Sequence, residues 1–194
     1  MAEFWSIIDQ ARQPGGPTTP SASPEALKKV LADLPSEQIQ EFMREFWRKL
    51  IELNKWDLWG AGYVISGGMG DDSFHYFRSW IIGKGRDCFE VALKDPSGLI
   101  PFLDTVEVDN ELLEYVGLEV LEGRGITDDP GEGKVGNPDD EPSGEPFDED
   151  EVDDQYPKLA SFSAKFHVDP NPAEPPPSFG FFQSLLNRLR SPKR

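Results

Sequence analysis

The stretch from residue 56 to 86, WDLWGAGYVISGGMGDDSFHYFRSWIIGKGR, constrains the fold most, because large apolar residues crowd there on both sides of a glycine turn. Residues 56–65 are apolar nearly all round, which is typical of a helix in the centre of a bundle. Gly60 and Gly62 each disfavour a helix by about 1 kcal/mol relative to Ala, so they indicate close approach by a neighbour. The stretch therefore predicts two short, heavily buried helices joined by a tight turn.

Apolar residues recur at helical spacing on both sides of this stretch, most clearly where Ile39, Phe42, Met43 and Phe46 follow one another. A breaker run from Pro14 to Pro20 separates the first two helical patterns. No segment shows sustained two-residue alternation, the pattern of a half-buried strand. The sequence therefore predicts an all-α fold, a small irregular helical bundle. The expected helices span residues 3–12, 24–34, 39–51, 56–65, 71–83, 86–94 and 109–122, and Gly83 is expected to terminate the fifth.

The chain divides into four segments by composition. Residues 1–122 form the expected helical domain, and residues 123–146 are acidic and rich in Gly and Pro, which predicts a flexible linker. Residues 147–168 carry spaced apolar side chains and are expected to dock as an arm or short helix. Residues 169–194 combine a proline-rich spacer with a basic amphipathic tail. We therefore expect a long, partly disordered C-terminal region after the domain.

The acidic charge is concentrated in one part of the chain. The net charge is −17, and residues 101–170 alone hold 4 basic and 21 acidic side chains. This charge excludes nucleic acid and anionic membranes as partners, because both require Lys and Arg. A protein partner is expected instead, with a basic surface. A single cysteine, Cys88, together with the absence of a signal sequence or a long apolar run, predicts a cytoplasmic protein.

Asp71, Asp72 and Arg78 form the densest polar cluster within an apolar neighbourhood, with Ser73 and His75 between them. One interpretation is an N-terminal helix cap at Asp71 plus an internal Asp–Arg pair. The other is a ligand site in which Trp59 and Trp80 form the walls. The glycine run lacks the Lys and Ser or Thr of a phosphate loop, and the two histidines are too far apart in sequence for a zinc site. No motif predicts catalytic residues, a metal or a cofactor.

Several short motifs occur in an order that composition alone would not give. They are FW at Phe4, LW at Leu58, YVISGG at Tyr63, DDSFHYFRSWII at Asp71, DPSGL at Asp95, LLEYVG at Leu112 and DQYPKL at Asp154. In this order the chain resembles the bacterial domain-of-unknown-function family 4240. The resemblance implies a small helical domain, usually cytoplasmic, and supplies no catalytic residues.

Two hypotheses for the function remain. The first is a noncatalytic interaction domain, of an acidic accessory or immunity type, that binds a protein partner through an aromatic groove and its negative segment. The second is a small-molecule-binding or enzymatic helical domain that uses Asp71, Asp72 and Arg78. A deep pocket opening onto these three side chains would favour the second hypothesis.

Overall fold

The computed structural model describes residues 2–15, 18–131 and 133–166. The fold is all-α, as the sequence predicts, and strands occur in the described residues only as one short hairpin. The proline-rich spacer and the basic tail lie outside the described residues. The elements are α1 Ala2–Ala11, β1 Arg12–Gly15, β2 Thr18–Ala22, α2 Pro24–Ala32, α3 Ser36–Glu52, α4 Trp56–Ser66, α5 Asp71–Lys84, α6 Arg86–Lys94, η1 Pro96–Phe102, η2 Glu111–Leu113, α7 Val116–Glu122, α8 Val152–Gln155 and α9 Pro157–Ser163.

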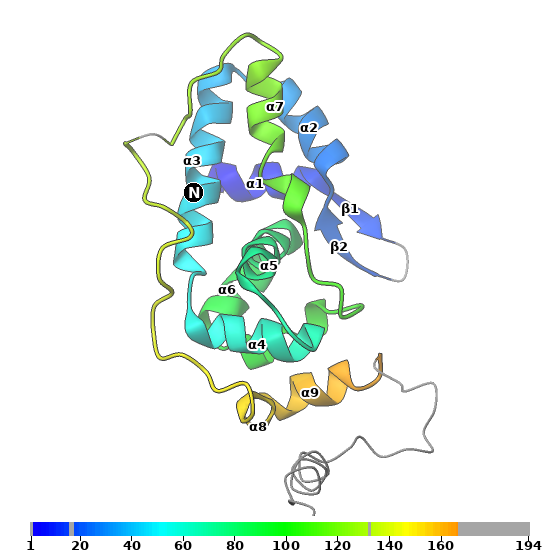
Figure 1. Ribbon diagram of the computed structural model, residues 1–194. Helices are drawn as coiled ribbons and strands as arrows, with labels where there is room; N and C mark the ends of the chain where they lie inside the picture. The colour runs from blue at the N-terminus through cyan, green and yellow to red at the C-terminus, as the bar shows by residue number, and fades with distance from the viewer. Residues whose placement is uncertain (1, 16–17, 132, 167–194) are drawn as a thin grey trace, which may run out of the picture.

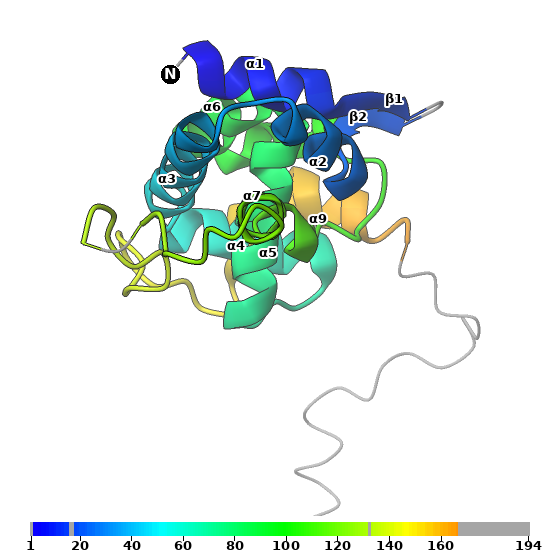
Figure 2. The ribbon, with the colours of Figure 1, turned by 90° about the horizontal axis from the view of Figure 1, so that it is seen from above.

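Helix α5 occupies the centre of the bundle. It lies between α2, α3 and α7 on one side and α4 and α6 on the other (Figure 1), and the view from above shows the other helices around it (Figure 2). Phe74 and every residue from Phe77 to Lys84 are buried. The sequence placed residues 56–65 in the centre instead. Helix α4 is buried on two sides, but its Trp56, Trp59 and Tyr63 remain partly exposed.

Two glycines let neighbouring side chains approach α4. A Cβ atom at Gly62 would lie 2.8 Å from the Phe77 ring and 2.7 Å from the Met69 sulfur. At Gly60 it would lie 3.3 Å from Phe147 and Val152. The close approach that the glycines indicated is therefore made by side chains of α5 on one face and of the C-terminal region on the other.

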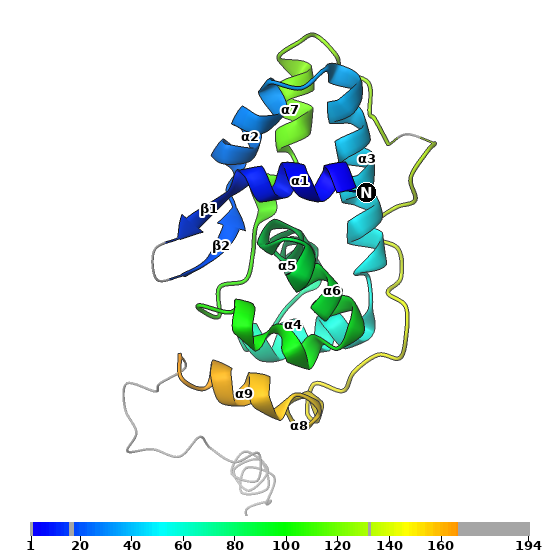
Figure 3. The same cartoon turned by 180° about the vertical axis from the view of Figure 1, so that it is seen from behind.

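The hairpin β1–β2 spans the run from Pro14 to Pro20, in which the sequence indicated only breakers, so that expectation was wrong. It also includes Arg12, which was expected to belong to the first helix. Its strands pair antiparallel, with Arg12 opposite Ala22 (Figure 3). Side chains remote in sequence hold β2 in place. The Thr19 N–H donates to the Asp104 carboxylate at 2.9 Å. The buried Lys84 ammonium donates to the Thr19 hydroxyl and to the Asp104 carboxylate. Because these partners come from distant segments, no local alternation was needed to form the strands.

Both ends of α5 differ from the sequence expectation. Gly70 is the N-cap and Asp71 is the first helical residue, with its Oδ1 accepting the Asp72 N–H at 3.1 Å. The helix passes through Gly83 and ends at Lys84, because Gly85 has a φ of 96°, which favours glycine. Gly83 instead faces Leu113, whose side chain would lie 3.1 Å from an added Cβ.

The C-terminal region packs on the domain. From the end of α7 the chain passes along the side of α3 and reaches α8 and α9, which lie against α4 (Figure 1). Val152, Tyr156 and Leu159 are buried there, and the Tyr156 hydroxyl donates to the Asp57 carbonyl at 2.7 Å. Segment 123–146, interpreted from composition as a flexible linker, makes the polar contacts described below. Among the helices of the described residues, none combines the length and apolar character needed to cross a membrane.

Candidate functional site

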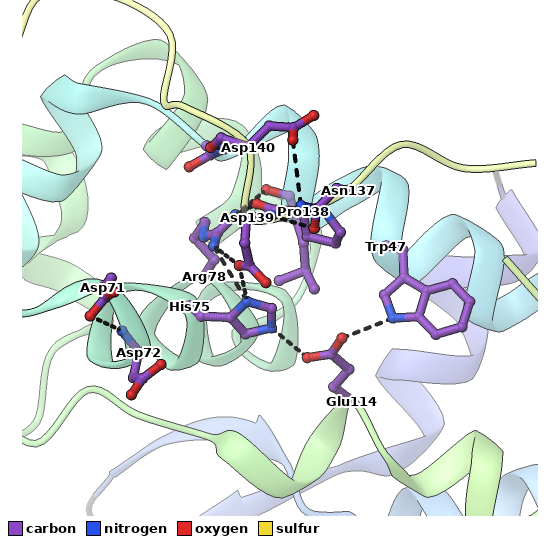
Figure 4. A network of polar contacts seen from close by, with 12 residues as sticks. Trp47, Asp71, Asp72, His75, Arg78, Glu114, Asn137, Pro138, Asp139 and Asp140 are labelled. Atoms are coloured by element: carbon purple, nitrogen blue, oxygen red, sulfur yellow. Dashed lines mark hydrogen bonds and ion pairs between the residues drawn. The ribbon is translucent and has the colours of Figure 1, made fainter. Parts of the chain in front are cut away.

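His75 and Arg78 stand one turn apart on α5 and face the segment that follows α7 (Figure 4). Spacing of three residues puts both side chains on one face of the helix. Asp139 reaches them from residues 123–146, and Glu114 reaches His75 from the turn between η2 and α7. We call His75, Arg78, Glu114 and Asp139 the junction network, because it joins the helical domain to its C-terminal region.

Arg78 is the most buried charge of this network, with a side chain only 3% exposed. Its Nη1 donates to the Leu50 carbonyl at 3.1 Å and to the Pro138 carbonyl at 2.7 Å, and its Nη2 donates to Asp139 at 3.2 Å. Burial lowers the pKa of Arg78, and the Asp139 carboxylate partly offsets this effect. Nη1 and Nη2 are thus committed to two backbone carbonyls and one acid within the chain, whereas the buried Nε has no hydrogen-bond partner among the described residues.

His75 lies between two carboxylates. Its Nε2 is 2.5 Å from Glu114 Oε2 and its Nδ1 is 2.7 Å from Asp139 Oδ1. The other oxygen of Glu114 accepts the Trp47 indole N–H at 2.8 Å. Burial acts to lower the pKa of His75, but the hydrogen bonds to Glu114 and Asp139 outweigh it and raise that pKa above 6.5. An imidazolium, which donates from both nitrogens, fits this geometry.

Asp139 is the acid on which both cations converge. Partial burial acts to raise its pKa, but hydrogen bonds and charge from His75 and Arg78 lower it below 3.8. The carboxylate is still 61% exposed, so it remains accessible from solvent.

Asp139 also lines three adjoining open clefts, which we together call the acidic trough. One, of about 330 Å³, is bordered by Trp47, His75, Glu114 and Asp129. A second, of about 300 Å³, is bordered by Trp56, Trp59, Asp71 and Arg78, and a third, of about 310 Å³, by Asp71, Asp72, Tyr76 and Tyr115. The clefts are partly open to solvent, and acidic residues recur along all of them.

A row of stacked side chains forms the wall of the second cleft. The rings of Trp56 and Trp59 are 5.0 Å apart and those of Trp59 and Phe74 are 4.8 Å apart, each pair within 7° of parallel. Arg78 continues the row, with its Cζ 4.8 Å from the centre of the Phe74 ring. The Trp59 indole donates to the Met69 carbonyl at 2.9 Å, which fixes its orientation. The wall therefore consists of three stacked aromatic rings, with the Arg78 guanidinium at one end.

The structure brings together four of the five candidate site residues. Asp71, Asp72, Arg78 and Trp59 border the acidic trough, whereas Trp80 is buried elsewhere, against Phe77 and Lys84. The acid paired with Arg78 is Asp139, not Asp71 or Asp72 as the internal-pair interpretation supposed.

Sequence reasoning missed Trp47, Glu114 and Asp139 and gave His75 no role. The spacing of His75 and Arg78 was a usable signal for a shared face. Asp139 gave none, because it stands among many acids in a Gly- and Pro-rich segment. Only the folded chain distinguishes it from them.

Other reactive groups in the described residues are already engaged or enclosed. Burial raises the pKa of the Cys88 thiol to about 12, which agrees with a small buried side chain rather than a nucleophile. Within the described ranges, no group of three or more His, Cys, Asp or Glu side chains could hold a metal ion. Both nitrogens of His75 face carboxylates, which leaves neither directed at a substrate.

The fold and the site define the class of protein. It is a helical domain that a charge network joins to an acidic C-terminal region. The chain belongs to the family DUF4240, described as a protein of unknown function, whose model matches residues 1–122 of the 194. The expected family is thereby confirmed, and the DQYPKL motif at Asp154 lies beyond the matched residues. No curated protein and no solved structure matches the chain. His75, Arg78 and Glu114 lie in the matched part, and Asp139 lies outside it.

Proposed function

We propose that the protein is a noncatalytic interaction domain that binds a basic, partly apolar segment of a partner protein in the acidic trough. The observation that carries this proposal is the stacked wall of Trp56 and Trp59 beside exposed carboxylates. Such a surface suits the long side chains of Arg and Lys, whose stems pack on rings while their charged ends reach the acids.

The charge along the trough supports a cationic partner. Asp71, Asp72, Asp129, Asp140 and Glu141 are exposed, and among the described residues none of them forms an ion pair. The two cations of the trough, His75 and Arg78, are already paired with Asp139. The unpaired carboxylates create a negative potential that speeds the approach of a basic surface.

The alternative, a small-molecule site that uses Asp71, Asp72 and Arg78, receives no specific support from this geometry. Arg78 Nη1 and Nη2 are bound to protein oxygens, and the clefts that these residues border are open. A small ligand is usually held in a deeper, more enclosed cavity.

A synthetic peptide rich in Arg and Lys, with apolar residues between the charges, tests the proposal. Its binding to the full chain is measured by isothermal titration calorimetry at physiological ionic strength. The double variant Asp71→Asn/Glu141→Gln removes two trough charges, and Asp87→Asn/Glu37→Gln removes two exposed charges elsewhere. Because an exposed ion pair contributes about 0.2–1 kcal/mol, removal of two such pairs should weaken binding by the trough variant roughly 2- to 30-fold.

The matched control variant should bind as the unaltered chain does. Equal weakening by both double variants would mean that net charge alone attracts the peptide, and the trough would then not be the site. Absence of binding to the unaltered chain would also contradict the proposal.

A further inference from the structure

Residues 137–143, which we call the strap, cross the domain along one border of the trough and are held there by polar contacts. Besides the contacts with Arg78, the Asp140 carbonyl accepts from the Asn54 side chain at 2.6 Å. The Ser143 N–H donates to the Asn54 carbonyl at 3.0 Å, and its carbonyl accepts the Trp56 N–H at 3.0 Å. No side chain of the strap is fully buried. Docking of the strap therefore depends on polar groups rather than on apolar burial.

We propose that His75 and Arg78 form a carboxylate receptor in the family domain, that Asp139 is its ligand from the same chain, and that protonation of His75 controls docking of the strap. Both receptor residues belong to the part matched by the family model, and the ligand belongs to the region after it. The receptor is thus a binding site of the domain that the C-terminal region fills.

Hydrogen-bond chemistry explains why His75 is the controlling group. Ionised carboxylates only accept, and a neutral imidazole has a single N–H to donate. A neutral His75 between Glu114 and Asp139 would leave one carboxylate oxygen facing a nitrogen lone pair. The imidazolium donates to both acids, so the observed arrangement is satisfied only when His75 carries its second proton.

The balance of charge leads to the same conclusion. With His75 protonated, the junction network holds two cations and two anions, whereas loss of that proton leaves an excess negative charge. Arg78 Nη2 lies 3.4 Å from His75 Nδ1, and its positive charge disfavours protonation of His75. Asp139 offsets this effect, because it accepts hydrogen bonds from both cations. The other titratable groups near His75 are mainly acids, which favour the imidazolium. They are Asp71, Asp72 and Tyr76 on α5, Tyr115 before α7 and Asp129 after α7, while α3 contributes the neutral Trp47.

The expected pH dependence follows from the direction of each shift. Glu114 and Asp139 both raise the pKa of His75, and docking of the strap supplies the part due to Asp139. Docking is therefore favoured while His75 is protonated and weakens as the pH rises through the pKa of His75 in the docked chain. The pKa of Asp139 is lowered below 3.8, so its contribution is complete above pH 3.8 and disappears as the pH falls through the lowered value. The strap should therefore dock most firmly from weakly acidic to near-neutral pH and loosen in alkali.

Nuclear magnetic resonance of the full chain tests the receptor directly, because the sequence has only His75 and His167. His167→Gln assigns the two imidazole signals. We expect the pKa of His75 to lie above 6.5 in the unaltered chain and to fall toward that value in Asp139→Asn. Titration of His75 at or below 6.5 in the unaltered chain would overturn the proposal.

Hydrogen exchange of the strap, corrected for the intrinsic effect of pH, tests the control of docking. The equilibrium constant for opening of the strap should be higher above the pKa of His75 than below it. The increase should be about tenfold for each unit by which docking raises that pKa. Asp139→Asn and His75→Gln should exchange faster than the unaltered chain at neutral pH and lose most of the pH dependence. Asp128→Asn, an exposed acid before the strap, is the matched control and should behave as the unaltered chain does.

Exchange in α6 serves as the internal reference in every sample, because this helix does not belong to the junction network. A strap that exchanges equally fast with and without the Asp139 carboxylate, while α6 stays protected, would show that the receptor does not hold it. These measurements are made without peptide, so their outcomes can be told apart from failure of peptide binding in the trough.

Discussion

At the scale of single residues, Arg78 is the side chain on which the junction network depends most. Its guanidinium spans the carbonyls of Leu50 and Pro138 and the Asp139 carboxylate, which lie in segments far apart in the sequence. A lysine has a single charged nitrogen on a flexible stem and cannot reproduce this planar fork. The residue is therefore a positioning group for the strap as well as a buried charge.

We expect Arg78→Lys to destabilise the chain by about 1–3 kcal/mol, because at least one buried acceptor would lose its donor. Urea unfolding followed by circular dichroism measures this loss. Arg86→Lys is the matched control, since Arg86 is exposed and pairs only with Glu90 one turn away, and we expect it to change stability by less than about 0.5 kcal/mol. Equal stability of the two variants would mean that the fork of Arg78 is dispensable.

At the scale of elements, the short helices α8 and α9 show how the C-terminal region attaches to the domain. Leu159 of α9 is completely buried, and Ser163 donates its hydroxyl to the Ile65 carbonyl of α4 at 3.0 Å. Helices this short are unstable alone in water, so packing against α4 must stabilise them. The arm that the sequence predicted in residues 147–168 contains these two helices.

Leu159→Ala should cost about 2–5 kcal/mol, because it removes a buried side chain and leaves a cavity against α4. Lys158→Ala, at the exposed neighbouring position, should be nearly neutral. Thermal unfolding compares the two variants. A loss at Leu159 no larger than that at Lys158 would show that α9 does not contribute to the cooperative core.

At the scale of the whole molecule, the region matched by the family model is only part of the folded unit. Phe147 lies against α4, and Val152, Tyr156 and Leu159 join the core. Sequence periodicity alone suggested that a chain ending after residue 122 would lose little stability unless the arm docks. The structure shows that the arm docks, which changes the expected result.

We expect a chain shortened to residues 1–122 to melt at least about 10 °C lower than one shortened to residues 1–166, because losing several buried side chains, each worth about 1.5–3 kcal/mol, exposes α4. The longer form keeps every described buried residue and is the control. Differential scanning calorimetry gives both melting temperatures, and binding of the dye ANS reports the exposed apolar surface. Equal melting temperatures would mean that residues 123–166 lie outside the cooperative unit.

The sequence by itself determined most of the helices, because they depend on apolar periodicity and on local breakers. Residues 109–122, expected as one helix, instead form η2 and the shorter α7. Residues 86–94 form α6 as expected, and the glycine turn after residue 65 separates α4 from α5. The family could also be recognised from the order of local motifs. These features are readable because their causes lie within a few residues of one another.

Only the tertiary structure decided which helix is central, that residues 12–22 pair as a hairpin, and that Asp139 meets His75 and Arg78. Each of these outcomes depends on partners far apart in the sequence. Asp139 acquires its role because Arg78 presents a buried guanidinium and His75 a second donor, whereas the other acids described in residues 123–146 lack such partners. Composition indicated an acidic linker, but the pairing of one carboxylate with two distant cations is a property of the folded chain.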